Sequence, residues 1–365
     1  MKHLFACFFL LSLATIPQAN NTHAALANTT TDSSTNIFII TLDGFRWQEL
    51  FGGADDAILQ NNHFTTDIDL MESMYGGSTA EEKRKKLMPF MWQVLAKKGQ
   101  LYGNRRYDNN VNVANLYAIS YPGYNEIFTS TTDVTIATNN KNNNPHRNIF
   151  ELLQSNPTYK DHIALFTSWD VFPYILNEKR MGIAINSGYE NINNANTDIE
   201  KNINSIQTNI IEAKEATRQD MLTFIAAKEY LNKNHPKLFY LGLGETDEYA
   251  HHGNYDMYLQ KANEADNIIA QLWHWAQTTP GYKNNTTFII TTDHGRGANP
   301  NKWTSHGPFT KGASQTWVAL LGKNIEALGE VKNSGQLYQK QIAPTIAQLA
   351  GERFSNETPI NLASK

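Results

Sequence analysis

The sequence predicts an α/β fold in which a central, mostly parallel sheet carries helices on both faces. Short, nearly continuous apolar runs recur along the chain, which is typical of strands buried on both faces. Stretches with helical periodicity separate these runs, and that alternation favours parallel strands. The 365 residues, 41% of them hydrophobic, can bury a large core. The predicted strands are 36–42, 163–167, 238–243, 286–292 and 315–321.

Helices are predicted between and after these strands, at 90–98, 221–232, 256–277 and 337–350. Two further stretches, 52–86 and 185–215, are interpreted as insertions because they are polar and lack a firm period. Each is as consistent with surface loops and solvated helices as with a cap that covers a site and selects the substrate. We therefore expect a single catalytic domain, 28–365, in which either insertion is a candidate cap.

The N-terminal residues 1–27 have the features of a secretory signal. A basic start precedes the apolar stretch 4–16, and Ala25-Leu26-Ala27 fits a cleavage site. The apolar stretch is too short to span a bilayer and no later run qualifies, so we expect an exported protein without a membrane span, periplasmic or secreted. The only cysteine, Cys7, lies in this segment, so the mature chain would contain no disulfide and no thiolate metal ligand.

The charge balance gives no sign of a nucleic-acid partner. The chain has 31 basic and 35 acidic residues spread along its length, with a formal net charge of −4. No basic stretch is typical of binding to duplex nucleic acid. The charge pattern says nothing about the oligomeric state.

Acidic and imidazole side chains follow three of the predicted strands. Asp43 ends the first, the pair Asp293-His294 ends another, and Asp247 comes shortly after the strand 238–243. A single aspartate after a strand is more often a turn former or a helix cap. Because the carboxyl ends of parallel strands meet at one edge of a sheet, where α/β folds bind their ligands, we expect these groups to converge.

Two further histidines belong to the same group. His251 is four residues after Asp247, which places the two on one face of a helix, although such a pair also forms surface ion pairs. His306 lies in a predicted loop beside Gly307. The six aspartate and histidine ligands are enough for two metal ions, and a site of only oxygen and nitrogen ligands favours Zn²⁺, with Mn²⁺ as the alternative.

Ser120 is the candidate nucleophile. It precedes Pro122 at the predicted start of a helix, where free N–H groups and the helix dipole favour an alkoxide and a phosphate. A nearby metal ion would lower the pKa of its hydroxyl. The alternative interpretation is an ordinary helix cap, which is common.

Taken together, these segments resemble the alkaline phosphatase superfamily, and within it the type I phosphodiesterase/nucleotide pyrophosphatase branch. The resemblance depends on five motifs in the same order and covers residues 36 to 321. The motifs are Leu42-Asp43-Gly44, Ser120-Tyr121-Pro122, Asp247 to Gly253, Thr292-Asp293-His294-Gly295 and His306-Gly307.

The resemblance implies a division of labour among these residues. One ion would be bound by Asp43, Asp293, His294 and the Ser120 hydroxyl, and the other by the set Asp247, His251 and His306. Ser120 would attack the phosphorus of a small phosphate ester in line, and the resulting phosphoseryl intermediate would be hydrolysed in a second step. Arg296 and an asparagine among 142–144, either Asn142 or Asn144, are the candidates for contact with the substrate phosphate.

Three departures from the branch keep other activities open. Ser120-Tyr121-Pro122-Gly123 differs from the typical Thr-Phe-Pro-Asn, and His306 follows Asp293-His294 more closely, as in the phosphomutase branch. Tyr124 stands where sulfatases have an arginine. The sequence therefore predicts an exported phosphoric ester hydrolase, with a phosphodiesterase or nucleotide pyrophosphatase preferred. The alternatives are a phosphomonoesterase, a sulfatase-like hydrolase, a phosphomutase and an inactive metal-binding homologue.

Overall fold

The computed structural model describes residues 35–209 and 217–363. The predicted signal segment 1–27 and the end of the second insertion therefore lie outside the described residues. Within the described part, no helix is both long and apolar enough to cross a membrane.

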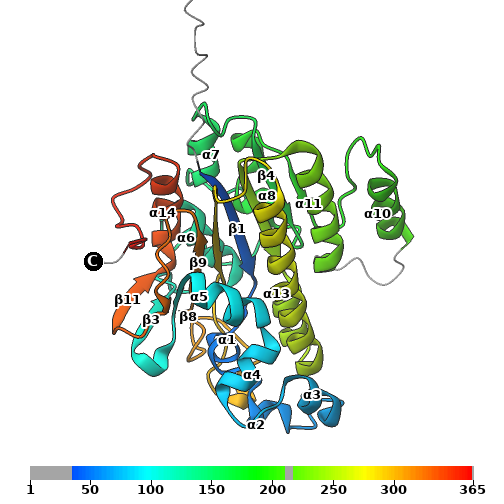
Figure 1. The fold of residues 1–365 in the computed structure, drawn as a ribbon, viewed down its shortest axis with the longest axis vertical. Coiled ribbons are helices and arrows are strands. Elements are labelled where there is room, and N and C mark those ends of the chain that lie inside the picture. Colours follow the sequence, from blue (N-terminus) through cyan, green and yellow to red (C-terminus); the bar gives the residue numbers. More distant parts are fainter. Residues whose placement is uncertain (1–34, 210–216, 364–365) are drawn as a thin grey trace, which may run out of the picture. The chain divides into compact units, whose positions relative to one another are not determined.

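The central element is an eight-stranded sheet with the order β10-β2-β9-β7-β1-β6-β4-β5 (Figure 1). The strands β7, β1, β6, β4 and β5 are mutually parallel, whereas β9 is antiparallel to both of its neighbours. The predicted mostly parallel sheet is thus confirmed. Its strands are β1 (Asn36–Leu42), β2 (Gly99–Tyr102), β4 (Ile163–Thr167), β5 (Ile185–Ser187), β6 (Leu238–Leu243), β7 (Thr286–Thr291), β9 (Val318–Gly322) and β10 (Gly329–Glu330).

A second, three-stranded sheet has the order β11-β3-β8. It brings together segments that are distant in the sequence, since β3 pairs with β11 in parallel and with β8 antiparallel. Its strands are β3 (Asn109–Asn112), β8 (Gln315–Thr316) and β11 (Gly335–Tyr338).

Alternate residues of β1 face two different cores. Phe38, Ile40 and Leu42 belong to one buried cluster, and Ile37 and Ile39 to another. This alternation follows from the two-residue repeat of a strand, and it explains why the run is apolar throughout. The prediction of helices on both faces is therefore confirmed.

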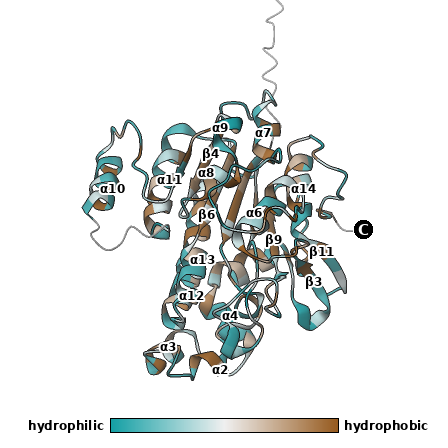
Figure 2. Cartoon of the chain, turned by 180° about the vertical axis from the view of Figure 1, so that it is seen from behind, coloured by the Kyte–Doolittle hydropathy of each residue, from teal (hydrophilic) through white to brown (hydrophobic). Residues whose placement is uncertain are grey.

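The helices α11 and α13 pack on the first of these cores, and α6, α7, α8 and α14 pack on the second. Figure 2 shows the apolar strands at the centre, whereas α4 and α10 are mainly hydrophilic. The helices on the first face, with the neighbouring segments, are α1 (Trp47–Gly52), α2 (Asp56–Leu59), α3 (Ile68–Tyr75), α4 (Ala80–Leu87), the π-helix η1 (Met91–Leu95), α5 (Ala96–Lys98), α10 (Asp198–Asn209), α11 (Asp220–Asn234), α12 (Glu245–His251) and α13 (Tyr255–Thr278). The remaining helices are the 3₁₀ turns η2 (Arg105–Tyr107), η3 (Pro300–Lys302) and η4 (Gln339–Gln341), and α6 (Ser120–Thr129), α7 (Ile149–Gln154), α8 (Phe172–Ile175), α9 (Glu178–Met181) and α14 (Ile342–Leu349).

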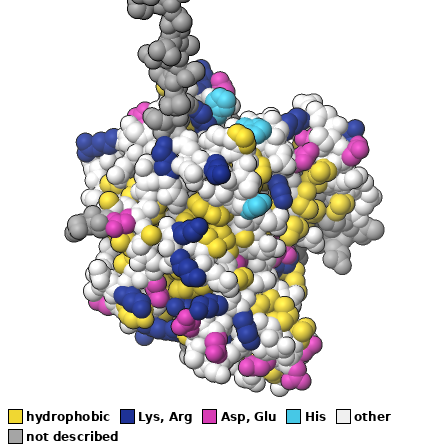
Figure 3. Space-filling view, in the orientation of Figure 1, with side chains coloured by type: hydrophobic (Ala, Val, Ile, Leu, Met, Phe, Trp, Pro, Cys, Tyr) yellow, Lys and Arg dark blue, Asp and Glu magenta, His cyan; other side chains and the backbone are white. Residues whose placement is uncertain are grey.

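The two predicted insertions contain short helices. Residues 52–86 form α2, α3 and α4, and the described part of 185–215 forms β5 and α10. Whether either segment caps a site stays a prediction. In Figure 3, lysine and arginine side chains are spread over the visible face with acidic side chains between them.

Candidate metal centre

Three adjacent parallel strands deliver acidic residues to the same edge of the sheet. Asp43 directly follows β1, and Asp293 follows β7 by two residues. Asp247 lies on α12, which begins just after β6. Because the ends of β1, β6 and β7 are in register, the three carboxylates start from neighbouring positions.

Asp43, Asp293 and His294 form the first group of potential ligands. Each offers a ligand atom within 4.8 Å of the others. The His294 Nε2 atom is 3.5 Å from Asp43 Oδ1 and 3.5 Å from Asp293 Oδ2. Asp293 and His294 are completely buried, and Asp43 is 4% exposed. Two carboxyl groups so close together in a buried site can both stay ionised only with a positive charge beside them.

A second group consists of Asp247, His294 and His306, whose ligand atoms also lie within 4.8 Å of one another. His251 is adjacent: its Nε2 is 3.1 Å from Asp247 Oδ2 and 3.0 Å from His306 Nε2. The His294 and His306 rings stack with their centroids 4.0 Å apart. The structure thus brings all six predicted ligands together, and it places His294 between the two groups.

The four most buried ligands share one feature. In each side chain, one of the two carboxylate oxygens or ring nitrogens forms a hydrogen bond to the surrounding protein. The other one faces the remaining metal ligands. The outer bonds are Tyr124 Oη to Asp43 Oδ2 (3.1 Å), Gly44 N to Asp293 Oδ1 (3.0 Å), His294 Nδ1 with the Gly295 carbonyl (2.9 Å) and His306 Nδ1 with the Ala118 carbonyl (3.2 Å). Metal-binding side chains are commonly oriented by such bonds.

The inner atom of Asp293 provides the test of whether a metal ion fits. Asp293 Oδ2 is buried and has no hydrogen-bond partner among the described residues. A buried, unsatisfied carboxylate oxygen is costly unless an ion binds it. The nitrogen and oxygen donors around it suit Zn²⁺ or Mn²⁺, so the residues fit a divalent ion.

The pKa shifts agree with this interpretation. Burial, together with the neighbouring carboxylates, raises the pKa of Asp43 well above its usual value, and burial does the same for Asp293. Burial lowers the pKa of His294 and brings that of His306 to about 4. Both imidazoles are therefore neutral at pH 7, which is the form that binds metal ions.

Asp247 differs from the other two aspartates. Burial opposes its ionisation, but Arg296 and the nearby histidines hold its pKa well below the usual value. Arg296 forms an ion pair with Asp247 Oδ1. Its Nε donates to the Trp303 carbonyl at 3.0 Å, and the guanidinium also bonds the Thr304 carbonyl. The structure therefore places Arg296, predicted to contact the substrate, in contacts within the protein.

Ser120 is the first residue of α6, as the sequence predicts, and only 4% of it is exposed. Its Oγ is 3.2 Å from His294 Nε2 and 3.5 Å from Asp43 Oδ1. The hydroxyl therefore borders the first group of ligands. At the N-terminus of a ten-residue helix, it also meets the positive end of the helix dipole.

The predicted asparagines lie beyond Ser120 in the loop that follows α6. Asn144 is buried and donates to Asn125 Oδ1 at 2.9 Å, whereas Asn142 is exposed and its carbonyl accepts from Tyr121 Oη at 2.7 Å. The sequence analysis missed Asn139, whose Oδ1 accepts from the Tyr121 backbone N–H at 2.9 Å. This contact brings a side-chain amide next to the N–H that follows Ser120.

Tyr124 is a second residue whose position the sequence did not reveal. It is buried on α6, one helical turn beyond Ser120, and its hydroxyl contacts Asp43. Burial raises its pKa well above the usual value, so the hydroxyl stays protonated and donates. The four-residue spacing from Ser120 is the signal that could have identified it.

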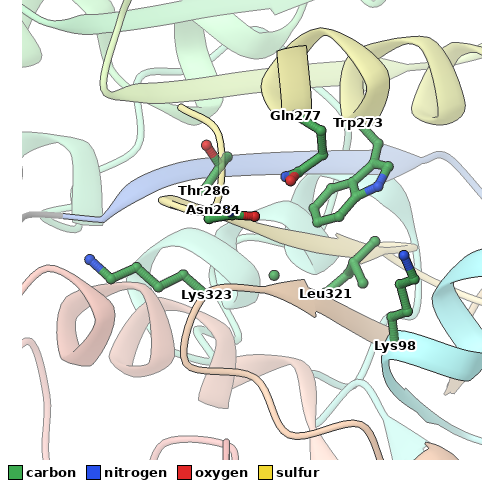
Figure 4. A pocket seen from close by; sticks show the side chains of 8 residues that line it. Lys98, Trp273, Gln277, Asn284, Thr286, Leu321 and Lys323 are labelled. Atoms are coloured by element: carbon green, nitrogen blue, oxygen red, sulfur yellow. The ribbon is translucent and has the colours of Figure 1, made fainter. Parts of the chain in front are cut away.

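A cavity of about 330 Å³ lies away from these residues (Figure 4). Its lining includes Thr286, which begins β7, and Gly322, which ends the antiparallel strand β9. Because Asp293 follows the opposite end of β7, the cavity and the metal ligands lie at different edges of the sheet. Trp273 and Lys98 also line it.

The comparisons with known proteins agree with the fold and with the binding of metal ions. The Metalloenzyme superfamily profile matches residues 118–350, so the chain belongs to this superfamily. A search of curated proteins returned no match. The family match and the fold agree with the predicted alkaline-phosphatase-like superfamily, and membership of a metalloenzyme superfamily implies that the chain binds divalent metal ions. The type I phosphodiesterase branch stays a prediction.

Solved structures of the same fold include three with different activities. The lipoteichoic acid synthase LtaP from Listeria monocytogenes has a TM-score of 0.57 at 14% identity, over 89% of this chain and 74% of its own. Wild-type alkaline phosphatase PafA has a TM-score of 0.57 at 11% identity, over 90% and 98%. The 2-O GAG sulfatase BT1596 has a TM-score of 0.54 at 12% identity, over 90% and 73%. At these identities the likeness defines the fold alone.

Proposed function

We propose that this chain is an exported phosphoric ester hydrolase with two divalent ions and Ser120 as its nucleophile, acting preferentially on phosphodiesters. The observation that carries the proposal is the place of the Ser120 hydroxyl, 3.2 Å from His294 Nε2 and 3.5 Å from Asp43 Oδ1. The motif resemblance to the type I phosphodiesterase branch supports the phosphodiester preference. The signal-like segment 1–27 supports export to the periplasm or the medium.

The residues divide the work of the reaction. Asp43, Asp293 and His294 would hold one ion next to Ser120, and the set Asp247, His251 and His306 would hold the other. When bound, two such ions neutralise the phosphate and stabilise the attacking and leaving oxygens. Zn²⁺ is preferred because half of the six ligands are histidines, with Mn²⁺ as the alternative.

Ser120 would form the new bond to phosphorus while the bond to the leaving alcohol breaks. The Ser120 proton would pass to solvent, and the departing alkoxide would take up a proton from solvent. Water then cleaves the phosphoseryl ester, which regenerates Ser120 and releases the phosphorylated product. The N-terminus of α6 favours both the alkoxide and the phosphate because its N–H groups and dipole point toward them.

The side-chain amide of Asn139 would bind a phosphate oxygen. Its Oδ1 accepts from the Tyr121 N–H at 2.9 Å, next to Ser120, which leaves its Nδ2 group as the donor. Arg296 would act indirectly, since it joins Asp247 to the segment that contains Trp303 and precedes His306.

A substrate panel tests the proposal. The mature protein, loaded with Zn²⁺ or Mn²⁺, is assayed with a bis-aryl phosphate, an aryl monophosphate and an aryl sulfate of the same leaving group. We expect the diester to be turned over with the highest kcat/KM. Preference for the monophosphate would make the chain a phosphomonoesterase, and preference for the sulfate would refute the proposal.

Ser120→Ala tests the nucleophile. We expect the rate to fall on the order of 10³-fold or more, because the covalent step is lost, while metal content measured by elemental analysis is kept. Trapping of a ³²P-labelled protein on rapid quench should succeed with the unsubstituted chain only. Full activity in Ser120→Ala would show that Ser120 is not the nucleophile.

A further inference from the structure

The backbone just before Ser120 has an unusual conformation. Ala118 has φ +46°, in the left-handed region that residues with a Cβ rarely adopt. Nothing in the alanine side chain favours this conformation, so its surroundings must hold it there. Such residues often lie at functional sites, where the strained conformation is needed.

Asn115 supplies the bonds that hold this conformation. Its Oδ1 accepts hydrogen bonds from the Tyr117 N–H at 3.1 Å and from the Ala118 N–H at 2.9 Å. Only 9% of Asn115 is exposed, so water competes little for these bonds. An asparagine side chain that accepts from N–H groups two and three residues later stabilises a tight turn.

Asn115 is itself anchored by Glu126 on α6. Glu126 is fully buried, and its carboxylate accepts from the Asn115 N–H at 2.9 Å and from Asn115 Nδ2 at 3.0 Å. It also accepts from the backbone of Ala114 and Lys340. The same helix therefore begins with Ser120 and fixes the turn that precedes it.

The last residue of the turn forms a hydrogen bond with a histidine of the metal centre. The Ala118 carbonyl is 3.2 Å from His306 Nδ1. A carbonyl oxygen can only accept, so this bond requires the proton on Nδ1 and leaves the Nε2 lone pair free. Nε2 faces the second group of ligands, 3.9 Å from Asp247 Oδ1.

We propose that Asn115 is a positioning residue for His306: it holds Ala118 in the left-handed conformation so that the Ala118 carbonyl fixes the His306 ring with Nε2 toward the second ion. The inference rests on the proposed function for the role of His306 as a ligand. The turn 115–118, which precedes Ser120, would then also orient a ligand of the second ion.

The first test needs no metal. In ¹⁵N NMR spectra of the metal-free protein with labelled histidine, His306 is expected to be a single tautomer with the proton on Nδ1. In Asn115→Ala, we expect a mixture of the two tautomers, because the carbonyl no longer points at the ring. An unchanged tautomer in a folded Asn115→Ala variant would overturn the inference.

The second test measures metal affinity by competition with a chelator. Zn²⁺ alone is the probe. In Asn115→Ala, we expect the affinity for one of the two equivalents to fall ~10- to 100-fold, as for other residues that orient a metal ligand, with the other equivalent unchanged. An equal loss at both equivalents would indicate a general structural defect and contradict the proposal.

Two companion variants separate positioning from folding. In Asn115→Ala with Ala118→Gly, glycine adopts a positive φ without strain, so we expect the tautomer and the affinity to recover in part. Asn115→Ser, whose hydroxyl can still accept one N–H, should fall between the unsubstituted chain and Asn115→Ala. Absence of recovery in the double variant would refute the role of Ala118.

The matched control is Asn148→Ala. Asn148 is another buried asparagine that bonds the backbone on both sides, at Glu151 N and the Leu176 carbonyl. We expect it to lower the melting temperature without changing the His306 tautomer. If the unsubstituted chain binds no second ion, the proposed function fails, whereas the tautomer comparison still decides the role of Asn115.

Discussion

Gly44 shows how a single hydrogen atom makes room for the metal centre. It follows Asp43 with φ +57°, and a Cβ there would be 2.5 Å from Asp247 Oδ1 and 3.1 Å from His294 Cε1. Only glycine fits both the backbone conformation and the space. The Leu42-Asp43-Gly44 motif therefore supplies a ligand and the room for ligands from the two neighbouring strands.

Gly44→Ala is expected to abolish tight binding of Zn²⁺, because the added methyl group would push Asp247 and His294 apart. Gly182→Ala is the matched control, since Gly182 also has a positive φ of 70° but no heavy atom within 4 Å of the place that a Cβ would take. Both variants should lose about 1–2 kcal/mol of stability from the backbone conformation. Calorimetric titration should show loss of binding in Gly44→Ala alone, and equal binding in both variants would contradict the prediction.

Tyr124→Phe tests the orientation of Asp43. Without the hydroxyl, Asp43 Oδ2 loses its donor at 3.1 Å, and the carboxylate can rotate its inner oxygen away from the ion. We expect Zn²⁺ affinity to fall ~10- to 100-fold while the fold is kept. Tyr159→Phe, which removes an equally buried hydroxyl bonded to the Thr35 carbonyl, should leave Zn²⁺ affinity unchanged.

At the scale of elements, the sequence predicted the buried strands well. The bounds of β1, β4 and β6 agree with the predicted runs, because continuous apolar residues identify a strand buried on both faces. The direction of β9 could not be predicted in this way, since an antiparallel strand buried in the same sheet has the same composition.

The prediction of a helix over 337–350 was wrong at its start. Gly335–Tyr338 form β11, and α14 begins only at Ile342. The strand depends on pairing with β3 more than two hundred residues earlier, and no local periodicity reports such a partner. The contact between His306 and His251 could not be predicted from local periodicity either, because it joins a loop and a helix that are distant in the sequence.

Asp266 on α13 bonds the start of η1, and its carboxyl group should make the free energy of unfolding depend on pH. Its carboxylate accepts from the N–H groups of Phe90 and Met91, yet burial raises its pKa to about 7. A raised carboxyl pKa means that the folded state holds the proton more tightly than the unfolded state. This contribution to stability is complete below the unfolded pKa near 3.8 and is lost as the pH rises through about 7.

Asp266→Asn should remove this dependence. Urea denaturation from pH 4 to pH 8 is expected to show the unsubstituted chain losing up to about 4 kcal/mol relative to the variant. The amide also changes one backbone bond, which adds an offset that does not vary with pH. A difference that stays constant or grows in the opposite direction would show that the two N–H donors outweigh burial.

For the whole molecule, we expect the stability of the central sheet to depend on the ions bound at the metal centre. Strands β1, β6 and β7 form the middle of the sheet, and the three carboxylates that follow them converge on one buried region. Arg296 pairs with Asp247 but forms no hydrogen bond or ion pair with Asp43 or Asp293 among the described contacts. Without ions, burial disfavours the ionised form of Asp43 and of Asp293, so the metal-free protein keeps two buried carboxyl groups at the ends of β1 and β7 at a cost in stability.

Removal of metal should accordingly lower the stability of the entire domain. Ions that bind only the folded state stabilise it by about 2.7 kcal/mol per site at a hundredfold excess over Kd, so chelation should reduce Tm by at least ~5 °C. Calorimetry of the protein before and after dialysis against a chelator measures this shift, and Zn²⁺ should restore it. Asp293→Asn removes a ligand together with a buried carboxyl group, so its Tm should be less sensitive to the chelator. Equal Tm values for the native and chelated protein would mean that the ions contribute nothing to holding β1 and β7 together.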